Sequence, residues 1–272
     1  MNNRILAIVV TYYPEKELLE KNISAFINYV DKIIIWENTP ESVKLSYRIV
    51  NAKIEYFGDS ANSISRGLNY AWRYAKENGY HYLLTMDQDS LLFEFETLKN
   101  YAFLHSTEMM ILGPTLSDTD YEKSSLKTVR CEKIITSGML IPVKILDLLG
   151  GYNEKLKVDG IDTDLCLRAN LQGIHVCQVN GCFLQQRFGQ PLVYKGKETR
   201  MISYSARRLR SILGAHVYLM RKYPNMSDAT KKEIMNNLIK TRLKSILRFE
   251  DNKISKTYHL LMGIIDGVLM KV

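Results

Sequence analysis

The stretch Tyr82-Leu83-Leu84-Thr85-Met86-Asp87-Gln88-Asp89-Ser90 decides the fold of this chain. Its first five residues are mostly apolar, as expected of a strand that is buried on both faces of a sheet. Two carboxylates, Asp87 and Asp89, follow directly, and alternate residues of an extended segment point to the same side. Carboxylate oxygens are hard ligands that suit Mg²⁺ or Mn²⁺, which also bind substrate phosphates. The stretch therefore predicts a metal and phosphate site at a strand end, and a solvated turn is the alternative that these residues alone leave open.

Strands and helices alternate through much of the chain. Apolar runs predict the strands, and apolar residues at helical spacing predict the helices between them. The predicted strands are residues 5–10, 33–36, 54–57, 82–86, 111–114, 134–141 and 176–179, and the predicted helices are residues 15–29, 61–76 and 162–171. This alternation predicts an α/β fold with a mostly parallel central sheet flanked by helices.

The length and the later pattern of the chain predict a second, helical part. Its 272 residues suffice for one large α/β domain with an appendage. From Lys197 to the end the apolar spacing is helical, so we expect a catalytic domain over residues 1–196 and a helical C-terminal extension over residues 197–272. The four cysteines form no C-x-x-C pair, and no apolar run approaches the roughly 20 residues of a membrane-spanning helix. Both features favour a cytoplasmic protein with free thiols.

Polar clusters follow four of the predicted strands. They are Thr11-Tyr12-Tyr13-Pro14, Glu37-Asn38-Thr39, residues 58–67 and Asp87-Gln88-Asp89-Ser90. Ligands of open α/β sheets bind at the carboxyl ends of the strands. Four polar clusters in register therefore indicate one shared crevice.

Together these segments resemble the GT-A-fold glycosyltransferases of family 2, and within them the rhamnosyltransferase-like branch, over residues 5–208. Residues 9–14 resemble the family's opening strand and nucleotide loop, and residues 62–69 resemble its Asn-x-Gly-x-Ala-x-Gly-x-Asn segment, with Ser63 in place of the first glycine. Asp87-Gln88-Asp89-Ser90 is similar to its metal-binding motif, which implies that Asp87 and Asp89 hold Mn²⁺ or Mg²⁺. The residues that the resemblance assigns to the donor nucleotide are Thr11, Tyr13, Glu37, Asn38, Asn62, Arg66, Gly67 and Asp87.

The resemblance continues in the second half of the chain. Thr136-Ser137-Gly138 is similar to the small-residue segment that lines the sugar and acceptor site, and residues 159–168 are the strongest single match. The resemblance implies that Asp162 is the general base, with Ser137, Gly138, Asp159 and Asp164 around the acceptor and sugar. Asp162 also suits a helix cap, and Arg168 is expected to form an ion pair with a nearby carboxylate.

The resemblance implies an inverting transfer in cell-surface polysaccharide assembly, from a nucleotide-diphosphate sugar to a lipid-linked or saccharide acceptor. Tyr204-Ser205-Ala206-Arg207 resembles the Tyr-x-x-Arg of the rhamnosyltransferase branch, which favours dTDP-L-rhamnose as the donor, with a UDP-sugar as the alternative. Gln186 stands where the family often has a metal-binding histidine, and Arg187 beside it could neutralise a diphosphate. This departure keeps open a catalytically weakened carbohydrate- or membrane-binding protein. A sugar-phosphate nucleotidyltransferase is a further alternative, although a Gly-rich phosphate loop does not follow the first predicted strand.

The net charge of +8 indicates an anionic partner or a solvated basic surface. Lys240, Lys244 and Arg248 recur every four residues and share a helical face, and the last segment carries Leu260, Leu261, Ile264, Ile265, Val268 and Leu269 at helical spacing. Basic and apolar faces together predict peripheral contact with the inner face of a membrane. Packing on the catalytic domain or in a homodimer is the alternative. We expect no nucleic-acid partner, because no recognisable nucleic-acid module is present.

Overall fold

In the computed structural model of the chain, strand β1 (Ile5–Thr11) is buried along its whole length and lies within a sheet. The structure describes residues 3–40, 47–59, 61–116, 127–186, 190–194 and 197–272. The chain divides into two units: unit 1 is Met1–Lys157 with Ile161–Arg187, and unit 2 is Val158–Gly160 with Phe188–Val272. The domain boundary predicted after residue 196 lies within unit 2 and stays a prediction.

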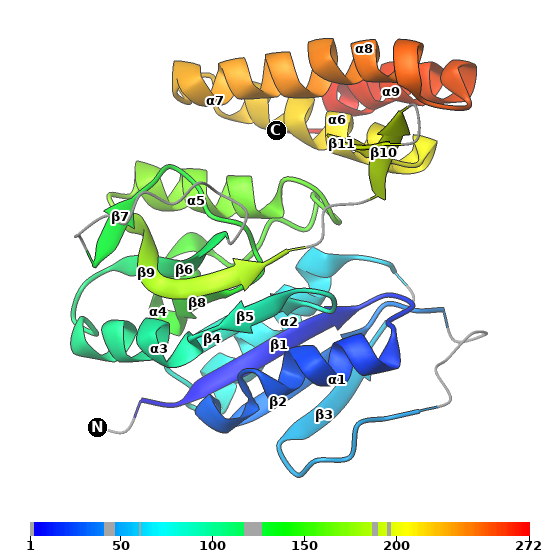
Figure 1. The fold of residues 1–272 in the computed structure, drawn as a ribbon. Helices are drawn as coiled ribbons and strands as arrows, with labels where there is room; N and C mark the ends of the chain where they lie inside the picture. Colours follow the sequence, from blue (N-terminus) through cyan, green and yellow to red (C-terminus); the bar gives the residue numbers. More distant parts are fainter. Residues whose placement is uncertain (1–2, 41–46, 60, 117–126, 187–189, 195–196) are drawn as a thin grey trace. The chain divides into compact units, whose positions relative to one another are not determined.

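The sheet of unit 1 has nine strands among the described residues (Figure 1). Eight of them lie in the order β3-β2-β1-β4-β8-β6-β9-β5, and β7 pairs with β9. β3, β2, β1 and β4 are parallel neighbours, as the sequence predicts, whereas β8 is antiparallel to β4 and β6. Besides β1, the strands are β2 (Lys32–Glu37), β3 (Ile54–Gly58), β4 (Tyr82–Asp87), β5 (Leu91–Phe93), β6 (Met110–Leu116), β7 (Thr128–Arg130), β8 (Met139–Pro142) and β9 (His175–Gln185).

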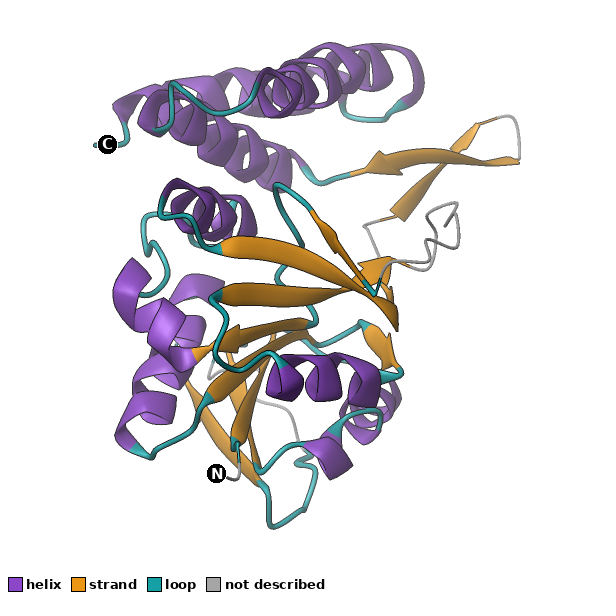
Figure 2. Cartoon of the chain, turned by 90° about the vertical axis from the view of Figure 1, so that its left-hand side faces the viewer, coloured by secondary structure: helices purple, strands orange, loops and turns teal. Residues whose placement is uncertain are grey.

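Helices flank this sheet (Figure 2). Alternate side chains of β1, from Ile5, Ala7 and Val9, join one apolar core with residues of the helices α1 and α3. The remaining side chains of β1 face the other way, because the side chains of a strand alternate, and α2 contacts β1 and β4. The helices of unit 1 are α1 (Lys16–Ser24), α2 (Ile64–Glu77), α3 (Phe95–Leu104), α4 (Val143–Leu149) and α5 (Ile161–Leu171), with a short 3₁₀ turn η1 (Ile27–Tyr29).

Three predicted elements of unit 1 differ from the structure. The strand predicted over residues 176–179 is longer, because β9 runs from His175 to Gln185. The helix predicted over residues 15–29 ends at Ser24, and η1 follows as a separate turn. The strand predicted over residues 134–141 begins only at Met139, because the preceding residues turn at Gly138, where φ is +83°. That backbone conformation favours glycine.

Unit 2 begins with a hairpin rather than with a helix. Strands β10 (Gln190–Tyr194) and β11 (Lys197–Ser203) pair in antiparallel fashion, so the helix expected from Lys197 is wrong for β11. The helical part that follows contains α6 (Ala206–Lys222), α7 (Asp228–Glu233), the π-helical segment η3 (Ile234–Thr241), α8 (Arg242–Phe249) and α9 (Lys253–Leu269). None of the helices in the described ranges combines the length and the apolar character needed to cross a bilayer.

Glycines let α6 and α9 pack at close range. A Cβ atom on Gly267 would lie 2.5 Å from the carbonyl oxygen of Gly214, and one on Gly263 would lie 2.6 Å from that of Arg210. Both distances are shorter than side chains tolerate, so this crossing requires glycine. Arg210 also forms an ion pair with Asp266 across the two helices, at 2.5 Å. The crossing fixes which side of α9 faces α6.

A buried polar network joins β11, α8 and α9. The Glu250 carboxylate is only 3% exposed and accepts hydrogen bonds from Lys256 Nζ at 2.7 Å, Ser245 Oγ at 2.8 Å and Ser203 Oγ at 3.0 Å. Burial by itself raises the pKa of Glu250, but the hydrogen bonds from Lys256, Ser245 and Ser203 outweigh burial and lower it. The network therefore holds an ionised carboxylate inside unit 2.

Candidate active site

The ends of the four parallel strands lie next to one another in the sheet. The register pairs Val10 of β1 with Asp87 of β4, Thr11 with Glu37 of β2, and Glu37 with Gly58 of β3. The structure therefore brings together the four polar clusters that follow these strands, and the predicted alignment of the clusters is confirmed.

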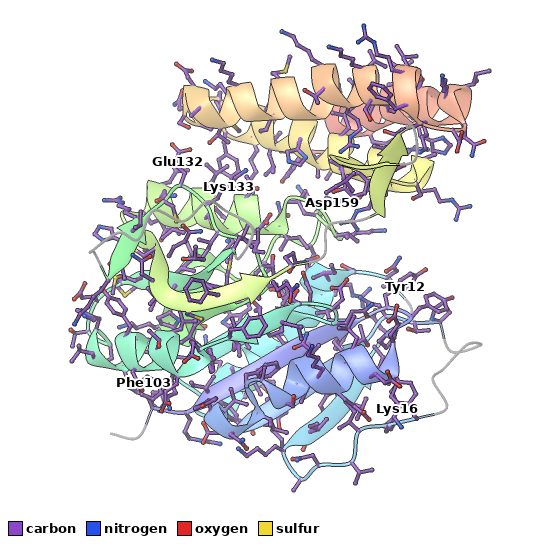
Figure 3. The ribbon with its side chains drawn as sticks, in the orientation of Figure 1. Tyr12, Lys16, Phe103, Glu132, Lys133 and Asp159 are labelled. Atoms are coloured by element: carbon purple, nitrogen blue, oxygen red, sulfur yellow. The ribbon has the colours of Figure 1, made fainter. Side chains whose placement is uncertain are left out.

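Two tyrosines after β1 form the most exposed part of this strand end. Tyr12 and Tyr13 are about half exposed, their rings meet edge to face with centroids 4.6 Å apart, and Tyr12 projects from the end of the strand (Figure 3). The Tyr13 backbone N–H donates to Thr39 Oγ1 at 2.8 Å, which links this loop to the end of β2. The two rings are the accessible apolar surface at this strand end.

The Gln88 side chain holds the backbone of Tyr12 from two sides. Gln88 Oε1 accepts from the Tyr12 N–H at 2.6 Å, and Gln88 Nε2 donates to the Tyr12 carbonyl at 3.0 Å. Only an amide offers both a donor and an acceptor in this arrangement. Sequence reasoning missed this residue, because its partner lies 76 positions earlier in the chain.

Three of the predicted nucleotide-binding residues are buried or half-buried and engaged within unit 1. Thr11 Oγ1 donates to the Trp36 carbonyl at 3.3 Å, and Asn38 Oδ1 accepts from Trp36 Nε1 at 3.1 Å. Both residues are 1% exposed. Glu37 is half-buried and pairs with Arg48 at 3.4 Å. Thr11 and Asn38 thus shape the strand ends, while Glu37 remains within reach of a ligand.

The first turn of α2 places a cation beside Asp59, which follows the end of β3. Arg66 pairs with Asp59 at 2.8 Å while its side chain stays 51% exposed. Asn62 has a φ of +45°, and Ser63 caps the helix by accepting the Arg66 N–H at 3.4 Å. Ser63 therefore has a capping role at the position where the resembling family has glycine. Gly67 packs beneath the Trp36 ring, where a Cβ atom would lie 2.6 Å from ring carbons.

Side chains from three distant segments bind Asp87. Its backbone N–H donates to Ser137 Oγ at 3.1 Å, and its carbonyl accepts from Asn22 Nδ2 at 2.6 Å. Its carboxylate accepts from Gln186 Nε2 at 3.1 Å, and the oxygen of the same amide accepts from the buried Ser90 hydroxyl. Ser137 therefore holds the backbone of Asp87 at the end of β4.

The carboxylate pair fits a divalent cation that shares its coordination with a substrate. Asp87 and Asp89 are both half-buried, and the Gln186 amide lies against Asp87. Within the described ranges, no group of three or more His, Cys, Asp or Glu side chains is placed to hold a metal. Mg²⁺ is usually bound through one or two carboxylates, with water and substrate phosphates in the remaining positions. The residues present match that mode of binding, and Arg187 lies outside the described residues.

The first turn of α5 carries the predicted base. Asp162 is half-buried, and its Oδ1 accepts the Thr163 N–H at 2.7 Å. The neighbouring Asp164 is 0% exposed and forms an ion pair with Arg168 at 2.8 Å, which confirms the ion pair expected for Arg168. Arg168 also donates to the Leu149 carbonyl at 2.6 Å and so anchors α5 to the end of α4.

The other two predicted acceptor residues lie in different surroundings. Gly138 is in the turn before β8, and its N–H donates to the Thr85 carbonyl at 2.7 Å. Asp159 belongs to unit 2, where it pairs with Arg208 at 2.9 Å and accepts from Ser211 Oγ at 2.7 Å.

Solved structures share this fold. A structure of GalNAc-T7 with UDP, GalNAc and Mn²⁺ matches with a TM-score of 0.62 and 11% identity, over 97% of this chain and 56% of that chain. S. aureus TarS 1–349 in complex with UDP-GlcNAc matches with a TM-score of 0.55 and 12% identity, over 96% of this chain and 81% of that chain. The chain has the mixed α/β GT-A glycosyltransferase fold, and the fold expected from the sequence is confirmed.

The sequence also has a full-length relative. The chain is 23% identical over 292 residues to the dTDP-rhamnosyl transferase RfbF of Shigella flexneri, with 98% of this chain and 96% of that protein covered. No protein-family model matches the chain. The relative confirms the resemblance to the rhamnosyltransferase-like branch of family 2. Fold and relative together support a glycosyltransferase that uses a nucleotide sugar.

Proposed function

We propose that this chain is a metal-dependent, inverting glycosyltransferase that moves L-rhamnose from dTDP-L-rhamnose to a hydroxyl of a lipid-linked or saccharide acceptor. The observation that carries the proposal is the carboxylate pair at the carboxyl end of β4, beside the ends of β1 and β2, in a chain similar along its length to a dTDP-rhamnosyl transferase. The proposed setting is cell-surface polysaccharide assembly, in the cytoplasm at the inner face of the membrane. A UDP-sugar is the alternative donor for the same site.

The donor nucleotide would lie across the strand ends of unit 1. The exposed rings of Tyr12 and Tyr13 offer surfaces for a base, and the half-buried Glu37 offers a carboxylate to a ribose. Arg66 supplies an exposed guanidinium suited to a diphosphate. Thr11, Asn38, Asn62 and Gly67 act through the backbone geometry that positions these groups.

Asp87 and Asp89 would hold Mg²⁺ or Mn²⁺, which when bound supplies positive charge against the leaving nucleoside diphosphate. Gln186 keeps the Asp87 carboxylate oriented through its 3.1 Å hydrogen bond. An amide is a weaker ligand for these ions than an imidazole, so the donor diphosphate contributes more of the binding in this chain.

Asp162 is the proposed base. Its Oδ1 is held by the Thr163 N–H, which leaves Oδ2 to accept the proton of the acceptor hydroxyl. As the acceptor oxygen forms its bond to the anomeric carbon, the bond from that carbon to the diphosphate oxygen breaks on the opposite face, and the configuration inverts. Asp164 and Arg168 act as positioning residues, because their buried ion pair fixes the first turn of α5.

Donor hydrolysis tests the proposal without knowledge of the acceptor. The protein is incubated with labelled dTDP-L-rhamnose or with UDP-sugars, with Mn²⁺, with Mg²⁺ and with EDTA. We expect slow release of dTDP and free rhamnose that EDTA abolishes. Release of nucleoside diphosphate from a UDP-sugar alone would reassign the donor. Pyrophosphate-dependent formation of a nucleoside triphosphate would identify a nucleotidyltransferase, and no reaction with any donor would favour a binding protein.

A further inference from the structure

The net positive charge of the protein comes from one of its two units. Unit 2 contains 17 lysines and arginines against 7 aspartates and glutamates, a formal charge of +10. Unit 1 contains 20 against 22, a formal charge of −2. A strong asymmetry of this kind is typical of a protein that meets an extended anionic surface with one part.

Helix α9 has an inner and an outer apolar side. On the inner side, Leu260 is buried, Ile264 packs against the core of unit 2, and Gly263 and Gly267 contact α6. Packing within unit 2 therefore explains why Leu260 and Ile264 are apolar. Leu261 is 56% exposed on the outer side and does not belong to that core.

The outer side of α9 is a continuous apolar stripe. Its members recur at alternating spacings of four and three residues, and each is between 47% and 89% exposed. The outer stripe consists of Ile254, Tyr258, Leu261, Ile265 and Val268. Side chains of this size leave several hundred Å² of apolar surface exposed, which is more than single surface residues produce.

Exposed basic side chains lie near both ends of α9 and on the segment before it. Lys253 and Lys271 stand near its two ends, and both are exposed. Lys240, Lys244 and Arg248 share one exposed side of η3 and α8, the segment that precedes α9. The acidic residue within α9, Asp266, lies on another side and is bound by Arg210, which lowers its pKa and keeps it ionised.

Charge decides between the two candidate occupants of the stripe. A second copy of the chain would bring two units of charge +10 together, and like charges oppose association. An anionic bilayer surface attracts the same charges and accepts apolar side chains at the boundary between headgroups and acyl chains. Tyr258, apolar with a polar tip, is a residue type suited to that boundary.

We infer that unit 2 binds the surface of an anionic bilayer, with the outer stripe of α9 inserted at the headgroup boundary and with Lys240, Lys244 and Arg248 contacting the headgroups. The helix lies along the surface and does not cross it. This inference deepens the proposed function, because it rests on that function for a lipid-linked acceptor at the same surface. Vesicle binding is nevertheless measured without any sugar transfer, so the two can fail separately.

Co-sedimentation with vesicles tests this surface. The full chain should bind vesicles of phosphatidylcholine mixed with phosphatidylglycerol, bind pure phosphatidylcholine much less, and be released by high salt. The variant K240Q/K244Q/R248Q should bind about 100-fold more weakly, because each basic side chain near an anionic surface contributes about fivefold. The variant L261S/I265S should lose at least about tenfold, because it removes apolar surface that enters the bilayer.

Matched variants in unit 1 serve as controls. L104S/L171S removes two apolar side chains that are 75% and 72% exposed, and K16Q/K21Q/R73Q removes three exposed basic residues. Both should bind vesicles as the unchanged protein does, and circular dichroism should show that all variants are folded. Equal binding to neutral and anionic vesicles, or equal losses in the controls, would overturn the inference. A stable dimer in solution that ignores vesicles would assign the outer stripe to a second copy.

Discussion

Unit 1 and unit 2 use charge and apolar surface in opposite ways. Unit 1 buries the apolar side chains of β1 and places two carboxylates where its parallel strands end. Unit 2 carries the net positive charge of the protein and leaves one apolar side of α9 exposed. The first arrangement suits the binding of a cation and a phosphorylated ligand, and the second suits attachment to an anionic surface. Under the proposed function and the inferred membrane contact, the chemistry lies in unit 1 and unit 2 sets the location.

The role assigned to unit 1 would be contradicted most clearly if a substitution at the proposed metal site left donor binding intact. We expect Asp89→Ala to reduce transfer by at least about 10³-fold, because the charge on the leaving diphosphate is no longer balanced. Vesicle binding should not change. Isothermal titration with dTDP-L-rhamnose and Mn²⁺ provides the measurement, and Asp228→Ala, an exposed carboxylate of unit 2, provides the control. Unchanged donor affinity in Asp89→Ala would contradict the assignment.

A second substitution separates donor binding from proton removal within unit 1. Asp162→Asn keeps the shape of the side chain but cannot take a proton, so transfer should fall by at least about 10²-fold. Donor affinity should stay within about twofold of the original. Single-turnover kinetics and donor titration measure the two quantities separately. Near-normal turnover in this variant would move the base to another carboxylate.

Acid should act on unit 2 through Glu250. The lowered pKa of Glu250 contributes stability that is present above its ordinary value of 4.5 and is lost as the pH falls through the folded-state pKa. Glu250→Gln leaves Lys256 without its buried counter-charge and should cost about 3 to 5 kcal/mol of unfolding free energy at pH 7. Urea titration at neutral and acid pH measures this. We expect acidification to lower the unfolding free energy of Glu250→Gln by less than that of the original protein. Glu96→Gln in unit 1 should behave as the original protein, because the Glu96 carboxylate forms only an exposed ion pair.

The two hydrogen bonds between the Gln88 side chain and the Tyr12 backbone offer a smaller and more specific test of unit 1. Gln88→Glu replaces the donor that meets the Tyr12 carbonyl with an oxygen, so the loop of Tyr12 and Tyr13 loses its position. We expect the donor KM to rise about tenfold, in line with one lost hydrogen bond and one repulsive contact, while kcat changes little. Gln172→Glu is the control, because Gln172 is exposed after α5. A fall in kcat at constant KM would show that Gln88 does not act through donor binding.

The smallest expected effect is a gain. Gln186→His places an imidazole beside Asp87, and imidazole binds Mn²⁺ better than an amide does. We expect the Mn²⁺ concentration for half-maximal donor hydrolysis to fall by about threefold to tenfold. The hydrogen bond from Ser90 offers the new ring a partner. No change in metal dependence would indicate that this position does not face the ion.

Local pattern was sufficient for the parallel half of the sheet. The apolar runs of β1, β2 and β4 are continuous because these strands are largely buried, whereas β3 is only half-buried. The order of the four strands with α1 and α2 leaves few topologies. The polar residues at the carboxyl ends of these strands therefore lie next to one another. The predicted alignment of Thr11, Glu37 and Asp87 follows from this reasoning.

Contacts between distant segments could not be predicted in this way. The hydrogen bonds of Gln88 with Tyr12 join residues 76 positions apart. The hydrogen bond of Gln186 to Asp87 joins residues 99 positions apart. Asp162 and Asp164 look alike in the sequence, and only the packing of α5 makes one half-buried and the other fully enclosed. The apolar spacing of the last segment likewise contains two sides of α9, of which only one packs within unit 2.

Unit 2 is discontinuous in the chain, and this limits where the two units can be separated by cutting the chain. Val158–Gly160 is part of unit 2, and α5 begins with Ile161 directly after it. The ion pair of Asp159 with Arg208 ties this short insert to α6. Cutting the chain after residue 187 would therefore leave Val158–Gly160 in the N-terminal fragment without the rest of unit 2, so the fragment would not be unit 1 alone.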